Sequence, residues 1–103
     1  MKLTEATERL FEAAKCGNVE AVQKAIEAGA KVNAKTKFLK NTALHWAAHN
    51  GHAPVVQFLI EKGANCNIRN ERWRTPAETA AARGHPNIAA IIEHAAEGKR
   101  QLR

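Results

Sequence analysis

The sequence predicts an all-α protein in which three copies of a helix pair stack into a short solenoid. The first observation is an internal repeat: similar segments end at Gly17, Gly51 and Gly84, which are 34 and then 33 positions apart. A period near 33 residues is typical of helical repeat proteins, in which each repeat forms one supersecondary unit. The second observation is that the copies hold short apolar stripes with helical spacing.

The second repeat shows the two stripes most clearly. Its first stripe, Leu44, Ala47 and Ala48, has the i, i+3, i+4 spacing of a helix face, and its small alanines allow a neighbouring helix to approach closely. The second stripe has larger side chains: Val55, Val56, Leu59 and Ile60. Small residues on one row of helices and large residues on the other predict a curved stack. We expect a single domain over residues 1–103, with repeats at approximately 4–33, 34–67 and 68–97 and a frayed tail at 98–103.

Local sequence signals mark where the helices begin and end. Thr42 and Thr75 are predicted N-caps, because a threonine hydroxyl can accept a hydrogen bond from a free backbone N–H in the first turn. Pro76 follows at the first helical position, where the missing N–H costs nothing. Gly51 and Gly84 are placed to end the first helix of their repeats. These signals agree with the repeat period.

Residues 42–52 read TALHWAAHNGH, which resembles the signature T-P-L-H-x-A-A-x-x-G-H of the ankyrin repeat family. The resemblance covers most of the chain. The second repeat departs from the signature at Ala43, and the outer repeats have Phe11 and Glu78 in the histidine position, as in the capping repeats of the family. The resemblance implies a short ankyrin-repeat solenoid with hairpin-like loops, and a non-catalytic role in protein–protein interaction.

The resemblance also implies that partners contact the loop tips and the exposed positions of the first helices. The two loops, residues 34–41 and 68–74, are basic and contain bulky apolar residues. Their cations are Lys35, Lys37, Lys40, Arg69, Arg72 and Arg74. Against these stands Glu71 alone, so the loops carry +5 of the formal net charge of +6. The chain contains no aspartate, and neither loop has the glycine that the family commonly uses for its tight turn.

Ten residues are therefore candidates for contact with a partner. They are Lys37, Phe38, Leu39, Lys40, Trp46, His49, Asn50, Arg72, Trp73 and Arg74. Aromatic side chains beside arginines are typical of binding hot spots. Two alternatives stay open: Trp46 could fold over its own helix as local packing, and Trp73 could hold the second loop against the second repeat.

Catalytic and metal chemistry find little support in the sequence. The chain has no serine and no glycine-rich phosphate-binding motif, and Cys16 and Cys66 are expected to be free thiols. His45 and His49 have the i, i+4 spacing of a metal-binding pair. The resemblance instead implies that His45 and His52 form hydrogen bonds with loop backbone. We expect no enzyme activity, no cofactor and no metal.

The basic loops predict that the protein binds an acidic surface of another protein. We expect the protein to be monomeric. The alternative is binding of nucleic acid or another polyanion, which a pI near 9.8 and aromatic residues among arginines also favour. No apolar run is long enough for a signal peptide or a membrane span, so we expect a cytoplasmic or nuclear protein with no membrane contact.

Overall fold

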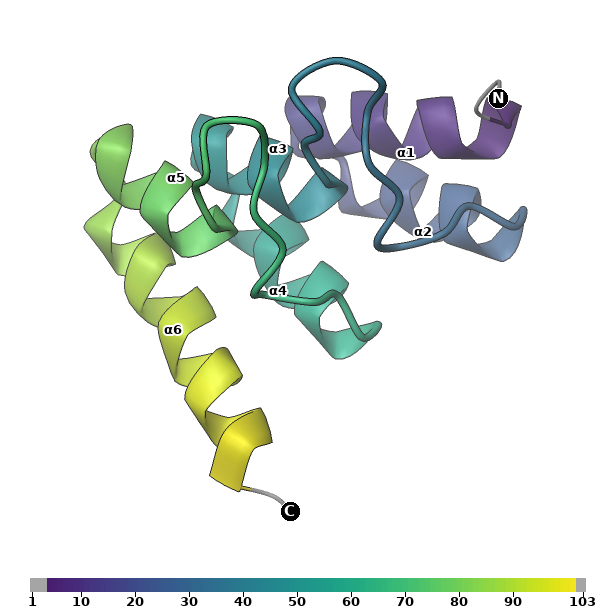
Figure 1. Ribbon diagram of the computed structural model, residues 1–103. Helices are drawn as coiled ribbons and strands as arrows, with labels where there is room; N and C mark the ends of the chain where they lie inside the picture. Colours follow the sequence, from purple (N-terminus) through teal and green to yellow (C-terminus); the bar gives the residue numbers. More distant parts are fainter. Residues whose placement is uncertain (1–3, 102–103) are drawn as a thin grey trace.

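Over residues 4–101, a computed structural model shows six α-helices in a curved stack (Figure 1). The structure describes the backbone of residues 4–101 and the side chains of residues 4–98. Within that part of the chain there are no β-strands. The helices are α1 (Glu5–Cys16), α2 (Val19–Glu27), α3 (Ala43–Asn50), α4 (Ala53–Glu61), α5 (Pro76–Ala82) and α6 (Pro86–Gln101).

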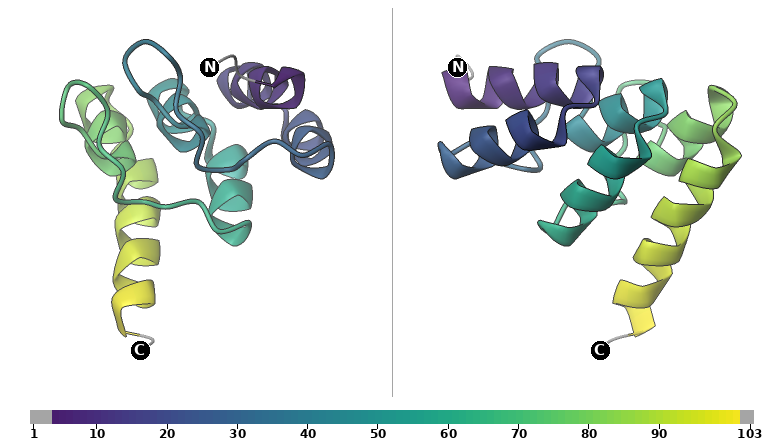
Figure 2. Two further views of the ribbon diagram at one scale, coloured as in Figure 1. Left: turned by 45° about the vertical axis from the view of Figure 1, so that its right-hand side comes forward. Right: turned by 180° about the vertical axis from the view of Figure 1, so that it is seen from behind.

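The helices form two rows. The inner row is α1, α3 and α5, in which α3 contacts both of its neighbours, and the outer row is α2, α4 and α6 (Figure 2). Within each repeat the inner helix is followed after a short turn by its outer partner. The two long connections, residues 28–42 and 62–75, lie on the same side of the inner row (Figures 1 and 2). This arrangement confirms the all-α repeat fold that the sequence predicts.

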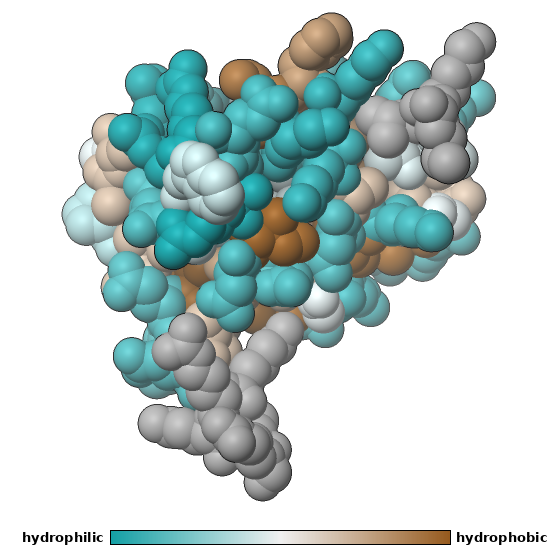
Figure 3. Space-filling view, viewed as in Figure 1, coloured by the Kyte–Doolittle hydropathy of each residue, from teal (hydrophilic) through white to brown (hydrophobic). Residues whose placement is uncertain are grey.

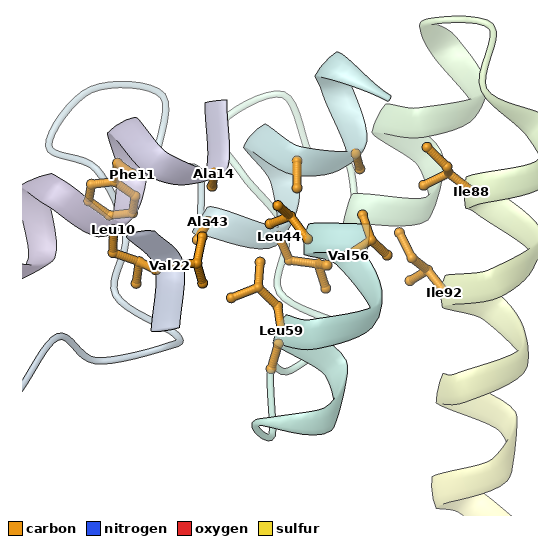
Figure 4. Packing of buried hydrophobic residues seen from close by; sticks show 14 of the residues in the cluster. Leu10, Phe11, Ala14, Val22, Ala43, Leu44, Val56, Leu59, Ile88 and Ile92 are labelled. Carbon is orange, nitrogen blue, oxygen red and sulfur yellow. The ribbon is translucent and has the colours of Figure 1, made fainter. Parts of the chain in front are cut away.

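The core lies between the two rows and has the size pattern expected from the stripes. The inner helices bury alanines such as Ala14, Ala47 and Ala80, which let α1, α3 and α5 lie close together. Larger side chains from both rows fill the space between them (Figure 4). The largest fully buried apolar side chains include Leu10, Leu44, Leu59, Ile88 and Ile92. These residues lie in one continuous cluster, so the three repeats share a single core.

Side-chain caps fix the starts of the helices, as the sequence predicts. The hydroxyl of Thr42 accepts a hydrogen bond from the His45 N–H, and that of Thr75 accepts one from the Glu78 N–H. In both cases the side chain of the third helical residue accepts a hydrogen bond from the backbone N–H of the capping threonine, which completes a capping box. Asn18 caps α2 through its side-chain oxygen.

Glycine and histidine pack against each other between successive repeats. A Cβ on Gly17 would lie 2.6 Å from Nδ1 of His52, and one on Gly51 would lie 2.9 Å from Cε1 of His85. Both glycines also have positive φ, which disfavours any other residue. His52 secures the contact because its Nε2 lies 2.9 Å from the Lys15 carbonyl oxygen.

The C-terminal end differs from the sequence prediction. Residues 98–101, predicted as part of a frayed tail, continue α6 to Gln101, and the rest of that tail lies outside the described residues. The segment before them is rich in alanine and glutamate, which propagate a helix well, and Gly98 alone does not end it. Although α6 is the longest helix, neither it nor any other described helix has the length and apolar character needed to cross a membrane.

Candidate functional site

The two basic loops lie side by side and form one continuous edge, here called the loop rim (residues 34–41 and 68–74). The backbone N–H of Glu71 donates to the Leu39 carbonyl oxygen at 2.8 Å. The side-chain Nδ2 of Asn70 donates to Oδ1 of Asn41, also at 2.8 Å. One backbone and one side-chain hydrogen bond therefore join the loops into one edge.

Asn70 organises the second loop. Its side-chain oxygen accepts hydrogen bonds from the backbone N–H groups of Arg72 and Arg74, at 2.9 and 3.1 Å. Its own N–H donates to the Arg74 carbonyl oxygen at 3.1 Å, which closes the turn. An asparagine side chain can order a turn in this way because its oxygen replaces a backbone acceptor. Asn70 thus supplies an acceptor in a loop that has no aspartate.

Thr36 has a corresponding role in the first loop. Its hydroxyl accepts from the Asn41 N–H at 3.1 Å and donates to the Phe38 carbonyl oxygen. The Thr36 N–H donates to the Asn41 carbonyl oxygen at 2.9 Å. Both loops are therefore closed turns, built with asparagine and threonine side chains.

Three rim residues have left-handed backbone conformations although none of them is glycine. Leu39, Lys40 and Trp73 have φ values of 65, 54 and 61°. For residues with a Cβ this conformation costs roughly 1–2 kcal/mol each. The hydrogen bonds around Asn70 and Thr36 hold the turns in this shape. Strain of this kind tends to gather at binding sites.

The rim exposes large apolar side chains at its tips. Phe38 is 77% exposed and Trp73 is 76% exposed, and Leu39 is 41% exposed. Trp73 therefore does not hold the second loop against the second repeat, which was one of its two interpretations. Lys37 lies above the Phe38 ring, with Nζ 5.9 Å from the ring centroid. The surface around the loops is mostly hydrophilic, with small hydrophobic patches (Figure 3).

Behind the rim lies a cavity of about 330 Å³, here called the groove cavity, between the loops and the inner helices α3 and α5. It is lined by Leu39, Asn41, His45, Trp46, His49, Asn70, Arg72, Arg74, Thr79, Ala82 and Arg83. The lining thus combines residues of both loops with residues of both helices, and it includes no carboxylate.

Three of the lining residues are arginines without an ion-pair partner. Within the described part of the chain, Arg72, Arg74 and Arg83 take part in no salt bridge, whereas Arg69 on the same rim pairs with Glu78 at 3.2 Å. The positive field reaches the neighbouring histidine. The pKa of His49 is lowered first by its partial burial and then by nearby cations, among them Arg83 and Arg72. The groove cavity is thus a concentrated positive site.

Trp46 forms part of the wall of the groove cavity. Its ring is partly buried, with the Lys15 ammonium 4.4 Å from its centroid and the His49 ring edge-on at 6.1 Å. Its Nε1 is buried and has no hydrogen-bond partner among the described residues. Trp46 therefore packs against neighbouring side chains and also faces the groove cavity, so both interpretations of this residue hold in part.

The family assignment follows from comparison with known proteins. A family model for ankyrin repeats, in three copies, matches residues 10–101. This chain belongs to the ankyrin repeat family. Ankyrin repeats generally mediate protein–protein interaction, and a domain of this kind is a non-catalytic module.

Several ankyrin-containing proteins are similar in sequence. Ankyrin repeat domain-containing protein 40 of mouse is 35% identical over 89 residues, which cover 86% of this chain and 24% of that protein. BRCA1-associated RING domain protein 1 of Caenorhabditis elegans is 37% identical over 84 residues, covering 82% of this chain and 12% of that protein. The human NAD-capped RNA hydrolase NUDT12 is 42% identical over 59 residues, covering 57% of this chain and 13% of the hydrolase. This chain therefore spans about a quarter or less of the length of these relatives.

Half of the contact residues predicted from the sequence line the groove cavity of this ankyrin domain. Leu39, Trp46, His49, Arg72 and Arg74 line the cavity, and Lys37, Phe38, Lys40 and Trp73 are exposed on the rim outside its lining. The remaining candidate, Asn50, donates through Nδ2 to the Lys15 carbonyl oxygen at 3.1 Å, so it links two repeats.

The prediction missed Arg83, and the ankyrin repeat itself could have revealed it. Arg83 directly precedes Gly84, just as Asn50 directly precedes Gly51 in the second repeat. Since Asn50 was selected for its place in the repeat, alignment of the third repeat would have selected Arg83 as well. The bond from Asn70 to Asn41 carried no comparable signal, because it joins two loops that are far apart in the sequence.

His45 lies in the lining of the groove cavity and forms a hydrogen bond with the second loop. It is almost fully buried, and its Nδ1 accepts from the Thr42 N–H at 3.1 Å, so its Nε2 carries the proton that is donated to the Arg74 carbonyl oxygen at 2.9 Å. Burial lowers the pKa of His45, while the bond to Arg74 partly opposes this shift. The hydrogen bond to loop backbone that the family resemblance implies is confirmed for His45. His52 instead bonds to the backbone carbonyl of Lys15 in the last turn of α1, so it links two repeats and not a loop.

The hydrogen bonds of His45 and His52 occupy ring nitrogens that a metal ion would need. His45 uses both ring nitrogens, and His52 directs Nε2 to a backbone carbonyl. The described residues contain no group of three or more histidine, cysteine, aspartate or glutamate side chains arranged to hold a metal ion.

Proposed function

We propose that this ankyrin domain binds a partner protein with an acidic surface through its loop rim and groove cavity. The observation that supports this most directly is the combination of exposed Phe38 and Trp73 with three unpaired arginines around a cavity without carboxylates. The general role of ankyrin repeats in protein–protein interaction provides the class of partner.

The rim divides the binding task between apolar and charged groups. Phe38 and Trp73 offer apolar area that is already exposed in the free protein, and aromatic side chains of this kind contribute strongly to interfaces. Exposed cations such as Lys37 and Lys40 instead raise the association rate with an acidic partner, and this effect weakens with salt. The closed turns of the rim limit the conformational entropy lost on binding.

Nucleic acid is the competing ligand for the same positive edge. Exposed aromatic rings beside cations can stack with single-stranded bases. However, Phe38 and Trp73 are on different loops, and the concentrated charge lies in the groove cavity behind them. A discrete cavity suits a projecting side chain better than a continuous nucleic-acid backbone.

The proposal is tested by using the full chain as an affinity bait and comparing it with a rim variant. The rim variant carries three substitutions: Lys37→Glu, Arg72→Glu and Trp73→Ala. The control variant, Lys24→Glu with Lys62→Glu, makes the same change in charge on the outer row. We expect the wild type and the control to capture the same acidic protein from nuclease-treated extract, identified by mass spectrometry. The rim variant should lose it, and calorimetry with the purified partner should show the same difference.

Equal capture by the rim variant and the wild type would contradict the proposal. So would a complex that nuclease treatment abolishes, because the ligand would then be nucleic acid. Circular dichroism spectra and melting temperatures of the three proteins establish that each is folded.

A further inference from the structure

We infer that the groove cavity binds the phosphate group of a phosphorylated side chain on the partner. The inference rests on the proposed function and names the chemical group that the partner inserts between the loops and α3 and α5. It is carried by the donors that the cavity leaves unused, by their charge and by the volume of the cavity.

The strongest unused donors are the three arginines, and the buried Nε1 of Trp46 is a further donor without a partner among the described residues. The amides of Asn41 and Asn70 bond to each other, Thr79 donates its hydroxyl proton to the Thr75 carbonyl oxygen, and both ring nitrogens of His45 have partners. In contrast, Arg72, Arg74 and Arg83 have no hydrogen bond or ion pair through their side chains among the described residues. The cavity is therefore rich in free donors, most of which belong to cationic guanidinium groups.

The charge of this set matches a phosphate monoester better than a carboxylate. Three guanidinium groups remain protonated at any physiological pH, so the lining carries three permanent positive charges. A carboxylate would bring one negative charge, whereas a phosphorylated side chain brings about 1.5–2 and three strong acceptor oxygens. Arginine forms bidentate hydrogen bonds with phosphate, and Arg72 and Arg83 approach from two different elements.

The volume and the lining also fit a phosphorylated side chain. The cavity of about 330 Å³ lies at the lower end of the range for small-ligand pockets, so it can take one side chain but not a large ligand. Leu39, Trp46 and Ala82 provide apolar surface for the carbon atoms that carry the phosphate. Both ends of the modified side chain thus find matching groups.

His49 would report the bound phosphate directly. It lines the same cavity, and cations that include Arg72 and Arg83 contribute to its lowered pKa. A dianion placed among these arginines offsets their field and favours the protonated ring. Phosphate binding should therefore raise the pKa of His49.

The inference is tested by NMR titration of the full 103-residue protein with phenyl phosphate, benzoate and methyl phenyl phosphate. These probes share a phenyl ring and differ in carrying a phosphate monoester, a carboxylate or a phosphate diester. We expect phenyl phosphate to shift the Trp46 indole and His49 ring signals and to raise the pKa of His49. It should bind about tenfold more tightly than the other two probes, because only the monoester approaches two negative charges.

Matched variants locate the site. Arg83→Gln and Arg72→Gln should each weaken phenyl phosphate binding about tenfold, as expected for the loss of a charge-assisted hydrogen bond. Lys24→Gln removes a charge from α2, outside the rim and the cavity lining, and should leave binding nearly unchanged. The inference is overturned if benzoate or the diester binds equally well, or if Lys24→Gln weakens binding as much as Arg83→Gln does.

A phosphatase experiment separates this inference from the proposed function. Dephosphorylation of the captured partner should release it from the wild-type domain. If the partner stays bound after dephosphorylation but is still lost from the rim variant, the phosphate inference fails and the proposed function stands. If the rim variant also retains the partner, the proposed function fails as well.

Discussion

The helix stack and the loop rim of this protein are built on opposite principles. In the stack, each residue adopts the conformation it prefers: threonines and an asparagine cap helices, glycines take the positive-φ positions, and alanines lie where helices approach closely. In the rim, Leu39, Lys40 and Trp73 have the left-handed conformation, large apolar groups face water, and two of the arginines, Arg72 and Arg74, have no ion-pair partner among the described residues. The stack thus has the features of a stable scaffold, and the rim has the features that the proposed binding function requires.

If the stack carries the stability, the largest loss should come from its core. Leu59 is fully buried and belongs to the cluster shared by all three repeats. We expect Leu59→Ala to lower the free energy of unfolding by about 2–5 kcal/mol, because it removes apolar contacts and leaves a cavity. Urea denaturation followed by circular dichroism measures the change.

Gln57→Ala on the same helix is the control, because Gln57 is exposed. It should change the free energy of unfolding by no more than about 0.5 kcal/mol. Similar values for the two variants would show that burial in the stack does not determine stability.

The difference between stack and rim also explains what the sequence could predict. The helix starts at Thr42 and Thr75 and the bond of His45 to loop backbone follow from local or repeated patterns, and they could be predicted. The hydrogen bond from the Glu71 N–H to the Leu39 carbonyl and the bond that Asn70 Nδ2 donates to Asn41 join segments whose approach depends on the folded stack. No sequence pattern marks such contacts.

The cavity could likewise not be predicted from the sequence, although two of its three arginines were among the predicted residues. Arg72 and Arg74 were selected as loop cations, but their position around one space with Arg83 depends on how the second loop lies across α5. The exposure of Trp73 was also undecided, since a tryptophan can either pack against a loop or face water.

Within the rim, Asn70 should be the residue most important for stability. Asn70→Ala removes the acceptor of two backbone N–H groups and the donor to Asn41. We expect a loss of about 1–3 kcal/mol, since Asn41 is buried and loses a partner. Urea denaturation measures the loss, and faster amide hydrogen exchange at Arg72 and Arg74 should accompany it.

Asn41→Ala provides the matched comparison. It breaks the same bond between the loops but leaves the Asn70 oxygen bonded to Arg72 and Arg74. Exchange at these two amides should then stay close to the wild-type rate. If Asn41→Ala accelerates exchange as much as Asn70→Ala does, the hydrogen bonds from Arg72 and Arg74 to Asn70 are not what orders the second loop.

The connection between stack and rim should be sensitive to acid through His45. Its pKa is lowered in the folded protein, chiefly by burial, so the unfolded chain takes up a proton first as the pH falls. The stability that neutral His45 contributes is thus fully present above its ordinary pKa of about 6.5 and is lost as the pH falls below that value. We expect a lower free energy of unfolding at pH 5.5 than at pH 7.5.

His45→Gln tests whether this residue is the cause. Glutamine can accept from Thr42 and donate toward Arg74 without titrating. The variant should show a weaker dependence on pH, and His49→Gln should remove the further part due to His49, whose pKa is also lowered. An unchanged dependence in His45→Gln would exclude His45 as the acid-sensitive group.

Trp73 separates stability from recognition most sharply, because its ring is exposed while its backbone is left-handed. Trp73→Gly and Trp73→Ala both remove the ring, so both should abolish capture of the acidic partner. Only glycine relieves the backbone, so Trp73→Gly should be more stable than Trp73→Ala by about 1 kcal/mol, as measured by urea denaturation. Equal stability of the two variants would show that the rim stores no strain at this position, whereas a stabilised glycine variant that no longer binds would show that the strained tryptophan serves recognition.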